Sequence, residues 1–450
     1  MDKIKQPSVS GSFYSADEKE LISNINYFYQ NNRQDYNLAS RAIIVPHAGY
    51  YYSGQIASEG FQYLHRRVKN IFIFAPAHHM AFDGLAISSF DKWKTPLGEI
   101  EINQDYNKEL KKDFGCNFND EAFENEHSAE VQVPFVQAYY ETVKIIPILI
   151  GRAIPEMVTK IITHYWNDTD NGFIISSDLS HFLAFQEARK IDGVTAQMIE
   201  MLEVSNFQYQ QACGATGILG LVNFAKEKEF SLIRVDMKNS GDVSGDADSV
   251  VGYGSWFLYE GNKSEFIKKY FSDLIINVCK DSIEKGLGGK KLNLKDEKIH
   301  VPAVLEEYGA CFVTLTYNKM LRGCIGSIIA HQPLIDDLVH NAYNAAFSDT
   351  RFYPLSREEF ADLDISVSLL SSPERMSFND EQDLLGQIVP FTDGIIIKDG
   401  NHQAVYLPSV WEQLPDKEEF LNSLKQKAGL NRNHFSYTFE AYKFSTVHIP

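Results

Sequence analysis

Histidines follow three stretches of the chain that predict buried strands. His47 ends the run RAIIVPH, His78 ends NIFIFAPAH and His181 ends GFIISSDLSH. Because the carboxyl ends of parallel strands line one crevice of an α/β sheet, we expect these imidazoles to converge although they are remote in sequence. Neutral imidazole is a common metal ligand, and its pKa near neutrality also suits proton transfer. The pattern therefore indicates a metal site with a proton carrier beside it.

A fourth histidine lies in the segment ENEHSAEVQVPF, residues 124–135. His127 and Glu130 are about one helical turn apart near the start of a predicted helix, so they share one face of it. His79, next to His78, is interpreted as a supporting or structural residue.

A carboxylate is the remaining ligand that such a site requires. Two imidazoles and one carboxylate form the facial triad of non-heme Fe(II) enzymes, and zinc hydrolases use a similar set. The polar loop NSGDVSGDADSVVGYG, residues 239–254, offers three acidic side chains: Asp242, Asp246 and Asp248. Each suits a turn cap as well as a metal ligand, so the spacing alone leaves the choice open.

The elements that must position these groups alternate between strand and helix patterns. Short, β-branched apolar runs predict strands at residues 41–47, 70–79, 143–151 and 172–181, with a closing strand at 248–261. Amphipathic patterns predict helices at residues 15–32, 156–166 and 185–202. Strands that alternate with helices predict a three-layer α/β domain.

Composition limits the classes of function. The chain has 450 residues, too many for one ordinary core, and its formal charge of −18 argues against broad binding to nucleic acid. No signal peptide or membrane span is apparent, so we expect a cytoplasmic protein without a membrane partner. The five cysteines are scattered and form no zinc or disulfide pattern. Cys213 opens a predicted helix and lies either near the site or, as the preferred interpretation, in the core as a small buried residue.

The pattern of apolar and polar residues changes in the second half of the chain, which predicts a domain boundary after residue 261. Residues 262–298 predict one amphipathic helix followed by a glycine- and lysine-rich loop, whose GLGGKK stretch lacks the spacing of a phosphate-binding loop. Short strands and helices then mix, which predicts an α+β domain over residues 262–450, after an α/β domain over residues 1–261.

An ordered series of motifs in the first half resembles the Memo family. The motifs are GSFYSADEKEL, VPHAGYYYSG, FAPAHHM, TPLGEI, NEHSAEVQVPF, PILIG, SSDLSH, CGATGILGLV and SGDVSGDADSVVGYG, between about residues 7 and 260. That family is similar in fold to the LigB-type, class III extradiol dioxygenases. The resemblance implies a three-layer α/β/α fold and a metal site on His47, His78 and a residue in the 240s.

The resemblance also implies roles for individual residues. In animal Memo proteins the third ligand is a cysteine, and the corresponding place here is Asp242. A carboxylate at that place favours Fe(II) over softer metals, with zinc or copper as alternatives. His181 would then be the acid/base beside the open metal positions, and His127 a second proton carrier or substrate contact.

The second half resembles the AMMECR-type domain through LRGCIGS, NAYNAAFSDTRFYPLSREEF, DISVSLLSSPE, DGIIIKDGNHQAVYLPSVW and KQKAGL. Arg322 lies two residues before Cys324, where it either lowers the pKa of the thiol or leaves a packed cysteine. Fusion of the two domains resembles the AmmeMemoRadiSam system, which implies a radical-SAM partner protein.

Two functions follow as hypotheses. One is a non-heme metal-dependent oxygenase or related redox enzyme that acts on a small or modified substrate. The other is a non-catalytic module that binds a peptide or protein on a dioxygenase-like fold. Metal analysis of the protein and of a His47→Ala variant distinguishes them.

Overall fold

The computed structural model describes residues 2–32, 36–294, 296–297 and 301–450. Contacts divide the chain into two compact units, residues 1–263 and 264–450. Within the described residues, no helix combines the length and the apolar character needed to cross a bilayer.

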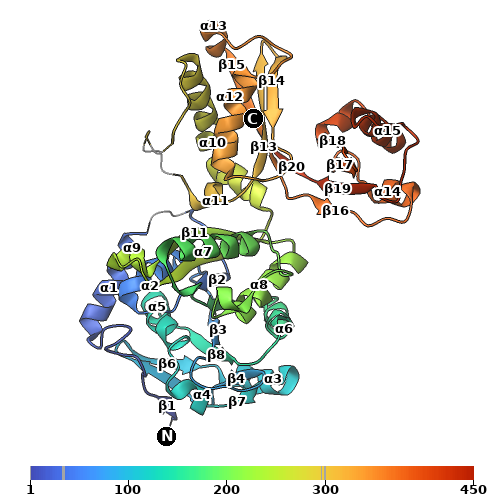
Figure 1. Cartoon of the computed structure of the whole chain (residues 1–450). Coiled ribbons are helices and arrows are strands. Elements are labelled where there is room, and N and C mark those ends of the chain that lie inside the picture. Colours follow the sequence, from blue (N-terminus) through green and yellow to red (C-terminus); the bar gives the residue numbers. More distant parts are fainter. Residues whose placement is uncertain (1, 33–35, 295, 298–300) are drawn as a thin grey trace. The chain divides into compact units, whose positions relative to one another are not determined.

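The first unit is built on a large mixed sheet, so the expected α/β character is confirmed (Figure 1). Its main path runs through β1 (Ile4–Lys5), β5 (Lys92–Thr95), β6 (Gly98–Ile102), β8 (Lys144–Ile150), β3 (Asn70–Pro76), β9 (Asn171–Ser176), β2 (Ala42–Val45), β12 (Val250–Tyr259) and β10 (His181–Leu183). Beside this path, β11 (Ser231–Asn239) pairs with β12, and β4 (Leu85–Ile87) pairs with β8 and with β7 (Asn117–Phe118).

The centre of the sheet is parallel and buried. Strands β8, β3, β9 and β2 are parallel neighbours, and nearly all of their residues are inaccessible to solvent. This is the pattern expected of strands covered on both faces, which is why their sequences are continuously apolar. One predicted boundary is wrong: β9 ends at Ser176, and His181 begins the separate strand β10.

Helices pack against both sides of this sheet in Figure 1. On one side lie α1 (Glu18–Gln30), α2 (Tyr50–Phe61) and α5 (Val133–Tyr139); on the other lie α3 (Gln104–Phe114), α6 (Pro155–Tyr165) and α8 (Ala215–Glu227), with α7 (Phe185–Glu200) beside β11. Short elements complete the unit: α4 (Glu121–Glu124), η1 (Glu130–Gln132), η2 (Tyr209–Gln211) and α9 (Ser240–Ser244). Helices α1, α6 and α7 correspond to the three that the sequence predicts.

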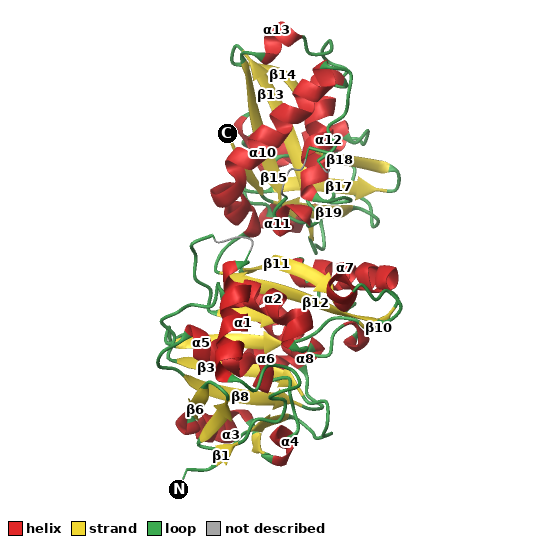
Figure 2. Cartoon of the chain, turned by 90° about the vertical axis from the view of Figure 1, so that its left-hand side faces the viewer, coloured by secondary structure: helices red, strands yellow, loops and turns green. Residues whose placement is uncertain are grey.

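The second unit is α+β, as its sequence predicts (Figure 2). One sheet has the order β14 (Met320–Gly326), β13 (Ala310–Tyr317), β15 (Leu363–Leu370), β20 (Thr446–Ile449); the other has β16 (Glu374–Arg375), β19 (Glu440–Phe444), β17 (Gly394–Asp399), β18 (His402–Tyr406). The helices are α10 (Lys263–Leu287), α11 (Ala303–Glu306), α12 (Leu334–Phe347), α13 (Arg357–Phe360), α14 (Glu381–Gln387), η3 (Pro408–Glu412) and α15 (Lys417–Lys427). Helix α10 is the predicted amphipathic helix, and residues 295 and 298 of the predicted loop lie outside the described residues.

A buried carboxyl in α7 makes the stability of the first unit depend on pH. Asp192 accepts the backbone N–H of Ser180 at 3.0 Å, and burial raises the pKa of Asp192 to about 6. An unfolded carboxyl has a pKa of about 4, so stability falls as pH rises from about 4 to about 6 and stays lower above that. Asp192→Asn is expected to raise the free energy of unfolding by about 2 kcal/mol at pH 8 and by little at pH 4. Denaturant unfolding at both pH values measures this, and an equal effect at both would contradict it.

Candidate metal centre

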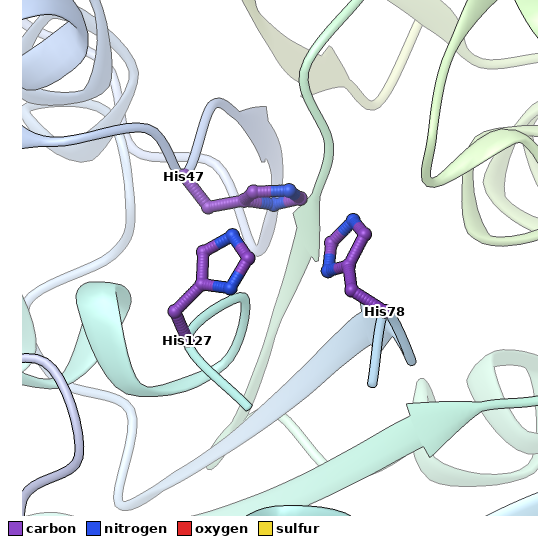
Figure 3. A group of neighbouring side chains, drawn as sticks. All are labelled: His47, His78 and His127. Atoms are coloured by element: carbon purple, nitrogen blue, oxygen red, sulfur yellow. The ribbon is translucent and has the colours of Figure 1, made fainter. Parts of the chain in front are cut away.

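Three imidazoles from separate segments point toward one another in Figure 3. One ring nitrogen from each of His47, His78 and His127 lies within 4.8 Å of those of the other two. Ring centroids are separated by 5.3 Å for His47 and His78, 5.5 Å for His47 and His127, and 4.8 Å for His78 and His127. Ligand nitrogens about 2.1 Å from one ion lie at most about 4.2 Å apart, so the rings need only sub-ångström shifts to share a cation.

The sheet explains why two of these histidines meet. His47 follows β2 and His78 follows β3, and both strands are parallel neighbours of β9. Their carboxyl ends therefore open onto the same edge of the sheet. This part of the sequence prediction, the convergence of His47 and His78, is present in the structure.

The third histidine is brought to the same edge by hydrogen bonds of its neighbour, Ser128. The Ser128 hydroxyl donates to the carbonyl of Pro76 at 2.7 Å, at the end of β3. The Ser176 hydroxyl donates in turn to the carbonyl of Ser128 at 2.7 Å, at the end of β9. These two bonds fix the segment that carries His127 across the ends of both strands.

Hydrogen bonding at Ser176 determines which nitrogen of His47 is protonated. The single proton of the Ser176 hydroxyl goes to Ser128, so its oxygen accepts from His47 Nδ1 at 2.9 Å. His47 therefore carries its proton on Nδ1 and a lone pair on Nε2. This ring is fully buried, and burial together with the neighbouring histidines holds the pKa of His47 well below its usual value.

A buried glutamate orients the other two rings. Glu126 Oε1 lies 3.0 Å from His78 Nδ1 and 3.3 Å from His127 Nδ1, and an ionised carboxylate only accepts. His78 therefore presents Nε2 as a lone pair, the arrangement in which a carboxylate behind a histidine fixes its tautomer for metal binding. Burial opposes ionisation of Glu126, but hydrogen bonds from His78 and Ser128 outweigh it and lower the pKa of that carboxyl.

His47 and His127 are neutral at physiological pH. Burial lowers the pKa of His127 to about 4, although the charge of Glu126 acts in the opposite direction. Neutral imidazole is the form that ligates metals. With one ring nitrogen from each histidine in this group, and with Nδ1 of His47 and of His78 hydrogen-bonded elsewhere, the donor set fits one divalent cation.

The thiol of Cys213 lies directly at this cluster, which is the less favoured of its two predicted places. Cys213 Sγ is 3.3 Å from His47 Nε2, and it also accepts the backbone N–H of Asp178 at 3.3 Å. Burial, reinforced by the charge of Asp178, raises the pKa of the Cys213 thiol. No spacing in the sequence links residues 47 and 213, so only the fold reveals this contact.

The acidic loop is placed differently from the expectation. Asp242 caps α9: its Oδ2 accepts the backbone N–H of Asn239 at 2.9 Å, and its Oδ1 lies 3.4 Å from Arg189. Asp246 accepts the N–H of Asp248 at 3.0 Å, and both are exposed. The convergent group of ligand atoms consists of three histidines and includes none of these carboxylates.

His181 and Asp178 lie close to the cluster. Burial lowers the pKa of His181, the carbonyl of Leu179 opposes this, and the charge of His78 lowers it further. Asp178 Oδ1 accepts the backbone N–H of His47 at 2.8 Å, and burial raises the pKa of Asp178 to about 7. His79 is exposed, and its ring centroid lies 6.0 Å from that of His127.

Glu130 anchors the N-terminal segment rather than joining the cluster. Its carboxylate binds Lys5 Nζ at 2.7 Å and the Tyr14 hydroxyl at 2.8 Å, all of them buried. The segment so held places the Phe13 ring 4.7 Å from the His127 ring. The N-terminal segment therefore packs on the imidazole cluster.

In the second unit, the two residues singled out by the sequence have separate partners. The Arg322 guanidinium binds Glu359 at 2.7 and 3.1 Å and the carbonyl of Tyr353 at 2.9 Å. Cys324 Sγ lies 3.1 Å from Thr314 Oγ1. The Arg322 guanidinium therefore pairs with the Glu359 carboxylate and not with the Cys324 thiol.

Comparison with known proteins assigns both halves of the chain to described families. Residues 5–257 match the model of the Memo-like protein family, and residues 276–449 match that of AMMECR1. A MEMO1 family protein of Aquifex aeolicus is 31% identical over 268 residues, covering 57% of this chain and 100% of that protein. One from Sulfurisphaera tokodaii is 31% identical over 277 residues, covering 56% of this chain and 97% of that protein. The crystal structure of an uncharacterized protein from Pyrococcus horikoshii is 30% identical, covers 40% of this chain and 90% of that chain, and gives a TM-score of 0.37.

Proposed function

Because this chain belongs to the Memo-like protein family and carries an AMMECR1 domain, we propose that its three-histidine cluster is the metal centre of a metal-dependent redox enzyme. The observation that carries the proposal is the convergence of one ring nitrogen from each of three histidines, while Nδ1 of His47 is bound to Ser176 and Nδ1 of His78 to Glu126. A merely structural cluster has no need of three imidazoles that face one another. The LigB-like, three-layer arrangement belongs to the same proposal.

The proposal changes one ligand of the set that the sequence predicts. His127 replaces Asp242 as the third ligand, beside His47 and His78, because the Asp242 carboxylate already caps α9. Imidazole suits iron, zinc and copper alike, and Fe(II) remains the proposed cation. Three neutral ligands leave its double positive charge uncompensated, which favours an anionic substrate.

The chain's own residues provide orientation and proton transfer. Glu126 and Ser176 hold the three rings, and the fold keeps His47 away from water. His181 is the proton carrier: its ring donates to the carbonyl of Leu179, which leaves the other ring nitrogen to accept a substrate proton. A bound ferrous ion would supply the electron-transfer chemistry that oxidation by dioxygen requires.

Zinc-dependent hydrolysis is the second candidate. Three histidines with one open position form the donor set of catalytic zinc in carbonic anhydrase. The observation that favours it is the absence of a carboxylate from the group of convergent ligand atoms among the described residues.

The cellular context is part of the proposal. Fusion of a Memo-like and an AMMECR1 domain supports a role beside a radical-SAM protein, whose iron–sulfur cluster would have to come from that partner. Among the described cysteines, none lies in a group with the spacing of such a cluster.

Metal analysis of the anaerobically purified chain tests the proposal. We expect about one iron per chain in the wild type, almost none in His47→Ala, and oxygen consumption only with the loaded protein. One zinc per chain without oxygen consumption would support the hydrolase. A folded wild type that takes up no transition metal would leave only a binding module.

Glu126 offers a separate test of how the cluster is held. Glu126→Gln keeps the size of the side chain but removes its charge and one of its acceptor oxygens. We expect a 10–100-fold weaker metal affinity, the usual cost of losing an outer hydrogen-bond partner. Competition with a chelating dye measures the affinity, and Glu124→Gln, on the exposed surface nearby, is the control. An unchanged affinity in Glu126→Gln would show that the carboxylate does not orient the ligands.

A further inference from the structure

A cavity of about 330 Å³ adjoins the metal cluster. Its lining includes Ala77, which directly precedes His78, and Cys213, whose sulfur contacts His47. The histidine rings are not themselves part of the lining, so Ala77 and Cys213 connect the cavity to His78 and His47. Its volume is that of a small-molecule site.

The walls of the cavity combine apolar side chains with polar surface. Pro76, Met80, Phe82 and Ile150 contribute hydrocarbon, thioether and aromatic surface. The loop that carries Phe82 is held against the end of β8, where the N–H of Arg152 donates to the carbonyl of Phe82 at 2.8 Å. These side chains suit the apolar body of a ligand.

The polar groups of the lining favour a negative charge. Arg152 is the one lining residue with a charged side chain, in a chain whose net charge is −18. Thr216 and Gly217 also line the cavity, in the first turn of α8, and their backbone N–H groups have no acceptor among the described residues. Free N–H groups at a helix start bind anionic oxygens.

We propose that this cavity is the substrate site of the metal centre and that it takes a small organic acid with an apolar body and one carboxylate. The inference rests on the proposed metal centre for its chemistry, but the cavity can be tested without the metal. Arg152 binds the carboxylate, and the apolar body lies along Pro76 and Ile150. The uncompensated charge of a bound cation would favour the same class of ligand.

Arg152 has a partner that provides a matched control. Its Nε lies 2.7 Å from Asp83 Oδ1, and both side chains are more than three-quarters exposed. Substitution of either residue breaks this pair without disturbing the core, and exposed pairs contribute little to stability. Arg152→Gln removes the cation, whereas Asp83→Asn leaves it free to bind an anion.

Calorimetric titration of the full chain with three ligands of similar shape tests the proposal: benzoate, benzamide and benzylamine. We expect benzoate to bind at least 10-fold more tightly than the other two. Arg152→Gln should reduce benzoate binding about 10-fold and Asp83→Asn should not reduce it, while Thr216→Met, which fills the cavity, should abolish it. Equal binding of benzoate and benzamide, equal losses in the first two variants, or full binding in Thr216→Met would overturn the proposal.

The same titration of metal-free and metal-loaded protein separates the two proposals. Benzoate binding that depends on Arg152 in a chain unable to hold metal would refute the metal centre and leave the cavity assignment intact. A chain that holds metal but shows no preference for benzoate would refute the cavity assignment alone. Benzoate that only ligates the cation would bind equally to the wild type and Arg152→Gln.

Discussion

Replacement of His127 with alanine is expected to weaken the affinity for a divalent cation by more than 100-fold. Loss of an outer hydrogen-bond partner already costs 10–100-fold, and removal of a ligand costs more. His127 is one of three residues whose ring nitrogens converge within 4.8 Å, so two imidazoles alone would remain. Titration against a chelator of known affinity measures the change.

The matched control is Asp242→Asn. Asp242 caps α9 and lies beside Arg189, so its amide replacement is expected to change metal affinity by less than 2-fold and to lower stability slightly. The opposite ranking, with Asp242→Asn severe and His127→Ala mild, would restore the set of two histidines and one carboxylate that the sequence predicts. Circular dichroism of both variants checks that they fold.

Replacement of Lys5 with methionine is expected to destabilise the first unit by about 3–5 kcal/mol. Lys5 and Glu130 are both buried, and the variant leaves the Glu130 carboxylate without its cation. The pKa of Glu130 is lowered overall, chiefly by Lys5 acting against the effect of burial, so the pair stabilises the fold above the usual pKa of a carboxyl and less as pH falls. Denaturant unfolding at neutral pH measures the loss.

Lys3 provides the control for Lys5. It forms a similar ion pair with Asp120, but its side chain is half exposed, so Lys3→Met should cost less than about 1 kcal/mol. In Lys5→Met, hydrogen exchange should also increase at the N–H groups of Ser8 and Val9, which donate to Glu130. Equal losses in the two variants would show that the buried pair does not anchor the segment.

Much of the site's framework could be predicted because it depends on the parallel sheet. The apolar runs before His47 and His78 are buried on both faces, so they identify β2 and β3 from the sequence alone. Parallel strands end at a common edge, and this rule is sufficient to bring the two histidines together. The prediction required no knowledge of side-chain contacts.

The third member of the cluster, His127, could not be predicted in this way because a pattern of acidic residues does not show which of them form local hydrogen bonds. Asp242 binds the backbone of Asn239, three residues away, and this cap competes with any metal. His127 reaches the cluster only because Ser128 is tied to Pro76 and to Ser176, which are 52 and 48 residues away. Contacts between residues so far apart in sequence form only when the chain is folded.

Local propensity alone does not determine the structure next to the site. Three consecutive tyrosines after His47 favour a strand, yet they begin α2. The reason is tertiary: Tyr50 is buried, its hydroxyl donates to the carbonyl of Val131 at 2.8 Å, and its ring packs 4.8 Å from Phe135. Burial of Tyr50 therefore outweighs the preference of the three tyrosines for a strand.

The most direct measurement is anomalous X-ray diffraction from crystals of the iron-loaded chain. The proposed centre requires one anomalous peak, about 2.0–2.2 Å from Nε2 of His47, His78 and His127, with Nδ1 of His78 still bound to Glu126. A peak held by Asp242, or by Nδ1 atoms, would contradict the account, as would crystals that contain no bound ion after loading.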